Sequence, residues 1–113
     1  MTIQYKNTGI DLNTSNAVSV LTSPASARCL IKQIQVNNGS GGALVVTTEV
    51  TDASASATYR LGNQSIAASS TTDLITKTLV LEESDILKMT CPTSDVIEGI
   101  ISYAQIDRSQ ENG

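Results

Sequence analysis

The sequence predicts an all-β protein, an antiparallel β-sandwich of the jelly-roll type with about eight or nine short strands. Apolar residues recur with a period of two in runs separated by Gly, Asn, Ser, Thr and Pro, and no long window has the 3.6-residue period of a helix. The apolar content comes from Val, Ile, Leu and Ala, with three Tyr and no Phe or Trp, which suits thin β-layers. With 113 residues, the chain is expected to form a single domain over 1–113.

The first half contains four apolar segments, and each ends in residues typical of turns. Residues 3–6 are followed by Asn-Thr-Gly, and residues 17–21 run into Thr-Ser-Pro, where the proline stops strand pairing. The N-terminal part, 1–16, is expected to be either an arm that reaches a neighbouring subunit or an edge strand of its own subunit. Residues 27–36 and 43–50 flank an Asn/Gly/Ser-rich stretch, which is the clearest hairpin turn in the sequence.

The second half repeats this pattern in shorter segments. The predicted strands are 58–61, 65–68, 74–81, 86–91 and 96–106. A Gly-Asn pair separates the first two, a Ser/Thr-rich turn follows the second, and an acidic turn joins the third to the fourth. Residues 107–113 are predicted to be a polar tail.

Two predicted strands carry apolar residues on both faces, although an antiparallel strand with one wet face should alternate apolar with polar. In 96–106, one face carries Val96, Ile100, Ala104 and Ile106, and the other carries Ile97, Ile101 and Tyr103. In 27–36, Leu30, Ile34 and Val36 share one face, whereas Cys29 and Ile31 share the other. A sandwich of this length has no third layer, so the extra face is covered either by a loop or the N-terminal segment, or by another subunit.

Of these two explanations we favour a subunit interface. Its predicted residues are Ile3, Tyr5, Ile31, Ile97, Ile101 and Tyr103. The first two lie in the N-terminal segment, and the other four stand opposite the better apolar face of each strand. A slip of one residue in the register would reverse the inner and outer faces.

Charge and hydropathy argue against two classes of partner. Seven basic residues against eleven acidic ones give a net charge of −4, which is the wrong sign for binding phosphate backbones, so no nucleic acid partner is expected. No apolar run approaches the ~20 residues of a membrane-spanning helix, and the first residues lack the blocks of a signal peptide. We therefore expect that the protein does not associate with membranes and that it is synthesised in a cytoplasm.

The residue types also leave little material for catalysis, cofactor binding or metal binding, and none of the three is predicted. The absence of His removes Ser-His and Cys-His pairs and most zinc and iron sites. Cys29 and Cys91 are expected to be buried free thiols rather than a disulfide. The acidic run 82–85 lacks the ligand spacing of a calcium loop and is interpreted as a solvated hairpin tip.

Four short stretches carry a family resemblance: TYRL at 58–61, IAASS at 66–70, LVLEESDILK at 79–88 and ISY at 101–103. Together they resemble small virion proteins of tailed bacteriophages, and the likeness spans about residues 17 to 106. This sequence has Glu83-Ser84 where that group usually has a small residue and Gly, and Ala68-Ser69 where it has Ala-Gly. The resemblance implies a structural component of a phage particle, made in the host cytoplasm and used in many copies.

Three functional classes compete under that reading. The first is a capsid decoration or cement protein that bridges capsid subunits, with the major capsid protein as partner and a homo-oligomer, preferably a trimer, as its own state. The second is a neck, tail or fibre component. The third is a receptor- or glycan-binding module, which the lack of Trp and Phe disfavours because sugars usually stack on aromatic rings. We expect the first.

Overall fold

The computed structural model describes residues 2–107, so all of the predicted polar tail except its first residue lies outside the described part. Within that part the chain forms nine strands and no helix. The strands are β1 (Thr2–Asp11), β2 (Val18–Thr22), β3 (Ala27–Asn38), β4 (Leu44–Asp52), β5 (Ala57–Ile66), β6 (Ser70–Asp73), β7 (Leu79–Leu81), β8 (Ile86–Thr90) and β9 (Ile97–Asp107). The predicted all-β class is confirmed.

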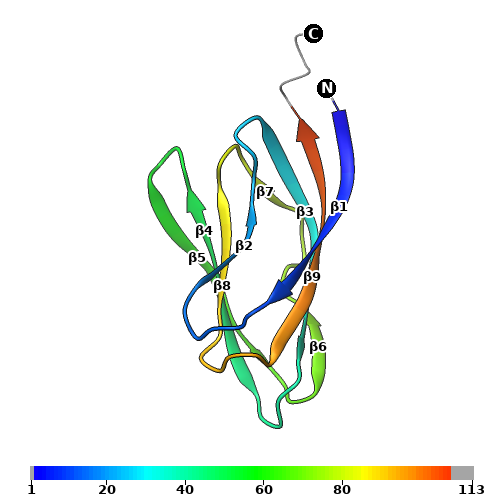
Figure 1. Ribbon diagram of the computed structural model, residues 1–113, viewed down its shortest axis with the longest axis vertical. Coiled ribbons are helices and arrows are strands. Elements are labelled where there is room, and N and C mark those ends of the chain that lie inside the picture. The colour runs from blue at the N-terminus through cyan, green and yellow to red at the C-terminus, as the bar shows by residue number, and fades with distance from the viewer. Residues whose placement is uncertain (1, 108–113) are drawn as a thin grey trace.

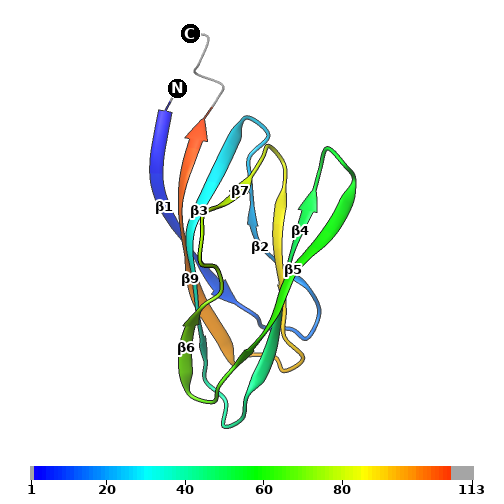
Figure 2. The same ribbon diagram turned by 180° about the vertical axis from the view of Figure 1, so that it is seen from behind.

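The strands form two antiparallel sheets packed face to face (Figures 1 and 2). Sheet A has the order β1-β9-β3-β6, with β7 also paired to β3, and sheet B has the order β2-β8-β4-β5. If β6 and β7 are counted as one interrupted strand, both sheets have the jelly-roll strand order. Every connection then passes from one sheet to the other except that between β4 and β5, which pair as a hairpin within sheet B. The N-terminal segment is an edge strand of its own subunit, since β1 pairs with β9 over all ten of its residues.

Strand boundaries differ from the prediction at three places. β1 continues through the predicted turn at 7–9 and ends at Asp11. The Gly62-Asn63 pair does not break a strand, because β5 runs through both residues and places Gly62 opposite Thr48 beside a bulge. The predicted strand 74–81 is instead a short β7, and the Ser/Thr-rich predicted turn before it is β6. Turn-type residues therefore formed edge strands, where side-chain packing selects less strongly for apolar residues.

Ser69 and Ser84 occupy the two positions where the sequence departs from the phage-protein pattern. Both have a left-handed backbone, with φ of 54° and 67°. Glycine adopts this conformation at little cost, whereas serine is strained there. The two turns therefore have a backbone conformation that suits glycine although serine occupies both positions.

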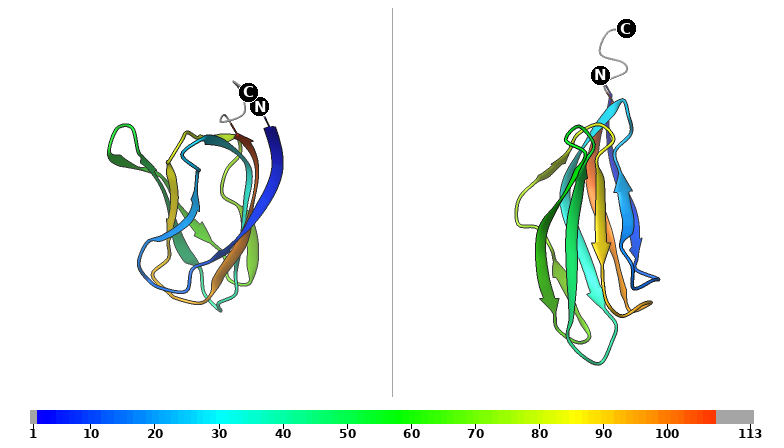
Figure 3. Two further views of the ribbon diagram at one scale, coloured as in Figure 1. Left: turned by 45° about the horizontal axis from the view of Figure 1, so that its top comes forward. Right: turned by 90° about the vertical axis from the view of Figure 1, so that its left-hand side faces the viewer.

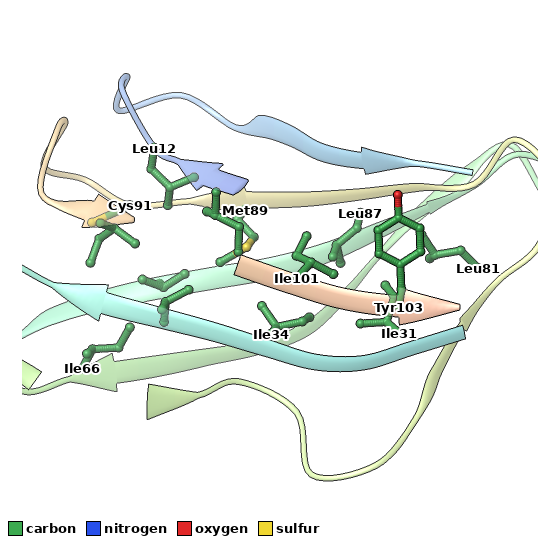
Figure 4. Packing of buried hydrophobic residues seen from close by; sticks show 14 of the residues in the cluster. Leu12, Ile31, Ile34, Ile66, Leu81, Leu87, Met89, Cys91, Ile101 and Tyr103 are labelled. Atoms are coloured by element: carbon green, nitrogen blue, oxygen red, sulfur yellow. The ribbon is translucent and has the colours of Figure 1, made fainter. Parts of the chain in front are cut away.

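The core lies between the two sheets and is almost entirely aliphatic (Figure 4). Its fully buried large side chains include Leu12, Ile31, Ile34, Ile66, Leu81, Leu87, Met89, Ile97 and Ile101. One polar side chain, Asn38, is also fully buried, and its amide donates to the carbonyls of Gly42 at 3.0 Å and Ile66 at 2.9 Å. Asn38 thereby ties the end of β3 to the following turn and to sheet B without leaving an unsatisfied buried group.

A β-bulge in β3 explains why that strand seemed to have two apolar faces. Pairing with β9 shifts between Ile31 and Gln33, so Lys32 is an extra residue. The bulge changes the alternation, and as a result Cys29 and Ile31 before it and Ile34 and Val36 after it all point into the core.

Close packing of sheet A depends on a glycine in β9. A Cβ atom added to Gly99 would lie 2.0 Å from the backbone oxygen of Gln35 and 2.9 Å from the Cα of Val36. Only a residue without a side chain allows β3 to approach β9 this closely.

Candidate docking surface

Four of the six predicted interface residues belong to the core of the subunit. Ile31, Ile97 and Ile101 have no exposed surface and Tyr103 is 7% exposed, and Figure 4 shows several of these side chains between the layers. Their assignment to an interface was wrong. In β9 the inner and outer faces had been reversed, and in β3 the bulge brought both sets of residues to the inner face.

The other two predicted residues, Ile3 and Tyr5, lie on the outer face of sheet A. Tyr5 is 87% exposed and Ile3 is 51% exposed. Ile10 points into the core, and Ile3 and Tyr5 lie an odd number of residues before it in the regular strand β1, so their side chains point away from the core. Their membership of an interface remains a prediction.

The strand register brings further apolar residues beside them. Tyr5 lies opposite Ala104, Ala104 lies opposite Leu30, and Leu30 lies opposite Val80, which makes one row across four strands. The next row pairs Ile3 with Ile106. Directly opposed residues of a sheet point to the same face, so these side chains form one surface.

We call this surface the apolar band, and it consists of Ile3, Tyr5, Leu30, Val80, Ala104 and Ile106. Val80 is 49% exposed, whereas Ala104 is only 4% exposed because its small side chain lies between larger neighbours in its row. The band occupies the end of sheet A nearest the two chain ends (Figures 1 and 2). Towards the other end, the same face carries Asn7, Ser102 and Gln33 in the next row.

A small charged cluster borders the band. The guanidinium of Arg28 donates from Nε to Oε1 of Glu83 at 3.1 Å and lies 3.9 Å from Oε2 of Glu82. Exposed ion pairs of this kind contribute little to stability. Their effect here is to give an apolar surface a polar rim, which is the usual anatomy of a protein interface.

Part of the band is recognisable in the sequence, although the predicted inner and outer faces are the reverse of those in the structure. Leu30, Ala104 and Ile106 were recognised as apolar residues of strands with two apolar faces, but they were assigned to the inner face. Val80 was not singled out, because β7 has only three residues and its alternation is too short to interpret.

The acidic turn before β8 is built differently from a solvated tip. Asp85 is 5% exposed, and its carboxylate accepts hydrogen bonds from the backbone N–H groups of Glu82 at 2.9 Å and Ala53 at 3.0 Å. The backbone of Ser23 also donates to the Asp85 carbonyl at 2.9 Å. Asp85 thus joins three chain segments at one end of the sandwich, and the carboxylate is committed to that structural task.

The thiols of Cys29 and Cys91 and the hydroxyl of Tyr103 do not act as surface nucleophiles. Cys29 and Cys91 are free and fully buried. Burial raises the pKa of the Cys29 thiol, against smaller lowering effects from a hydrogen bond with Ser23 and from the charge of Lys6. Burial likewise raises the pKa of Tyr103. A thiol that stays protonated is a poor nucleophile, so this group suits packing better than chemistry.

The depressions in the surface are shallow and bring few reactive groups together. A hollow of about 430 Å³ on sheet A is lined by Gln35, Val36, Asn37, Thr71, Glu98, Gly99 and Ile100, with one ionisable side chain among them. Among residues 2–107, no three His, Cys, Asp or Glu side chains gather as metal ligands would. The same residues contain no helix long and apolar enough to span a membrane.

No protein-family model matches the sequence, and no curated protein matches it either. A protein from a structure described as "Bacillus endospore appendages form a novel family of disulfide-linked pili" superposes with a TM-score of 0.53 at 13% identity, over 92% of this chain and 86% of that one. At this identity the likeness establishes a shared fold.

Two viral structures superpose less well. The cyanophage Pam1 capsid asymmetric unit gives a TM-score of 0.40 at 11% identity, over 90% of this chain and 84% of that one. The infectious bursal disease virus Gx strain gives 0.42 at 8% identity, over 95% of this chain and 34% of the viral chain. With TM-scores this low, neither match supports a conclusion about the present chain.

Proposed function

We propose that the chain is a non-enzymatic structural protein of a bacteriophage virion, a capsid decoration or cement protein that binds other virion proteins through the apolar band. The observation that carries the proposal is the band itself. A sheet needs one apolar face to pack against its partner sheet, and sheet A has apolar side chains on its outer face as well.

The composition of the band supports a protein partner. A contiguous apolar surface with a polar rim is costly to leave in water, and such surfaces mark sites of protein contact. Tyr5 is exposed over most of its surface and brings the large, rigid contact area that is typical of residues dominating a binding energy. The resemblance of 58–61, 66–70, 79–88 and 101–103 to tailed-phage virion proteins supports a phage particle as the assembly, with the major capsid protein as the proposed partner.

The proposal is tested by counting copies of the protein in purified particles of the phage that encodes it. A decoration protein should approach the abundance of the major capsid protein in quantitative mass spectrometry. Particles assembled without it should release their genome at a lower temperature than complete particles. Tens of copies or fewer would indicate the neck, tail or fibre instead, and absence from purified particles would contradict a virion role.

A further inference from the structure

A sandwich with two open sheets has four edge strands, and two of those in this protein are protected against pairing with another chain. β2 has five residues, and its pairing with β8 is irregular between Ser19 and Leu21. β6 and β7 have four and three residues and are separated by 74–78. Short and interrupted edges are the usual means by which proteins prevent strand addition.

The other two edges lack these features. β1 and β5 have ten residues each, contain no proline, and each pairs with a neighbouring strand on one side. β5 has a single charged residue, Arg60, and two exposed apolar residues, Tyr59 and Leu61. Long edges with few charges and exposed apolar side chains are templates for a further strand.

These two edges lie at opposite corners of the molecule. β1 borders sheet A on the side of β2, whereas β5 borders sheet B on the side of β6, and the left view of Figure 3 shows them on opposite sides of the sandwich. A contact between unlike edges repeats from copy to copy and closes into a ring when the rotation permits. The arrangement therefore suits head-to-tail pairing of copies.

A cleft beside β5 favours an extended segment with a basic side chain as its occupant. It is an open hollow of about 370 Å³ with apolar walls formed by Val50, Tyr59, Leu61, Leu79 and Val80. The charged residues that line it are acidic: Asp52 and Glu82 are accessible, and the carboxylate of Asp85 is nearly buried behind them. An extended segment carrying a basic side chain would complement this cleft.

β1 carries a basic side chain, Lys6, on the face that would continue the face of Tyr59 in a shared sheet. Lys6 is exposed and has the same alternation as the buried Ile10, so it belongs to the inner face of sheet A. Tyr59 pairs with Val50, which packs against the core, and so belongs to the inner face of sheet B. In a sheet continued from one copy to the next, side chains of the same face become neighbours.

We propose that β1 of one copy adds to β5 of a second copy, with Lys6 entering the acidic cleft beside Tyr59. Repetition of this contact would produce a closed homo-oligomer such as a trimer. The contact uses the strand edges and the cleft, which shares Val80 with the apolar band, and it can be tested on the purified protein whether or not the chain is a virion component.

Chemical cross-linking tests the contact directly. Asn7→Cys in β1 and Thr58→Cys in β5 place reactive thiols at exposed positions next to Lys6 and Tyr59, while Cys29 and Cys91 stay buried. With a short bis-maleimide, a mixture of the two variants should give covalent dimers, and each variant alone should give only background. Efficient dimer formation by Thr58→Cys alone would show two-fold pairing of β5 and overturn the proposal, as would failure of the mixture to cross-link.

Charge reversal tests the role of Lys6. Lys6→Glu should weaken self-association in sedimentation velocity by about tenfold, since an attraction to the cleft becomes a repulsion. Lys77→Glu is the matched control, because it makes the same change of charge at an exposed position outside β1, β5 and the cleft, and it should leave association unchanged. A wild type that stays monomeric throughout the concentration series, or equal effects of both variants, would overturn the proposal.

Discussion

Replacement of Asp85 by Ala tests whether one buried carboxylate joins the acidic turn before β8 to the segment that follows β4. The change removes the acceptor for the N–H groups of Glu82 and Ala53, at 2.9 and 3.0 Å. A hydrogen bond to a charged group contributes about 1.5–3 kcal/mol, and part of this is recovered when water reaches the site, so we expect a loss of about 2–5 kcal/mol. For a domain of this size that corresponds to a fall in melting temperature of roughly 10–20 °C.

Chemical denaturation and amide hydrogen exchange together provide the assay for this prediction. The unfolding free energy should fall, and the amides of Ala53 and Glu82 should lose protection more than those of central β9. Asp85→Asn, which keeps one acceptor, should lie between wild type and Asp85→Ala, and the exposed Asp11→Ala should change stability by less than about 0.5 kcal/mol. If Asp85→Ala unfolds within that same margin of the wild type, the carboxylate does not join the segments and the reasoning is refuted.

Three further predictions concern the core. Gly99→Ala should lower the unfolding free energy by about 2–3 kcal/mol in chemical denaturation, because its Cβ would lie 2.0 Å from the backbone oxygen of Gln35. Gly9→Ala is the control and should be close to neutral, since nothing lies within 4 Å of its Cβ. Similar losses for both variants would contradict the close approach of β3 to β9. Because the pKa of Cys29 is raised in the folded state, the folded protein holds the thiol proton at pH values above 9.0, where the unfolded chain loses it. The free energy of unfolding should therefore be constant with respect to this group below pH 9.0 and should decrease above it. Cys29→Ala should reduce that decrease. Ile101→Asp should prevent folding as judged by circular dichroism, while Ile100→Asp, at a position 47% exposed, should fold; the opposite outcome would mean that the faces of β9 are assigned wrongly.

The fold class was predictable because it depends on periodicity and turn spacing, which a sequence displays directly. Which face of each strand points into the core was not predictable in the same way. An extra residue such as Lys32 reverses the alternation, and nothing in the residue types marks it as a bulge. The need for Gly99 was equally hidden, because it arises from how closely β3 approaches β9.

The candidate surface could be predicted in part for the same reason. Apolar residues on both parities of β9 indicated two apolar faces, and Ile100 and Ile106 do lie on the outer one. Which residues share the outer surface depends on register between strands far apart in the sequence. The row from Tyr5 to Val80 joins four strands, and no local pattern predicts it.

Incorporation of point variants into particles tests most directly whether the apolar band binds other virion proteins. Tyr5→Asp and Val80→Asp each place a charge in the band at an exposed position, and Ile100→Asp places one on the same face of sheet A outside it. All three variants should fold with nearly wild-type stability, and only the two band variants should be lost from purified particles. Band variants that incorporate as well as the wild type, or an Ile100 variant that is lost to the same extent, would contradict this expectation.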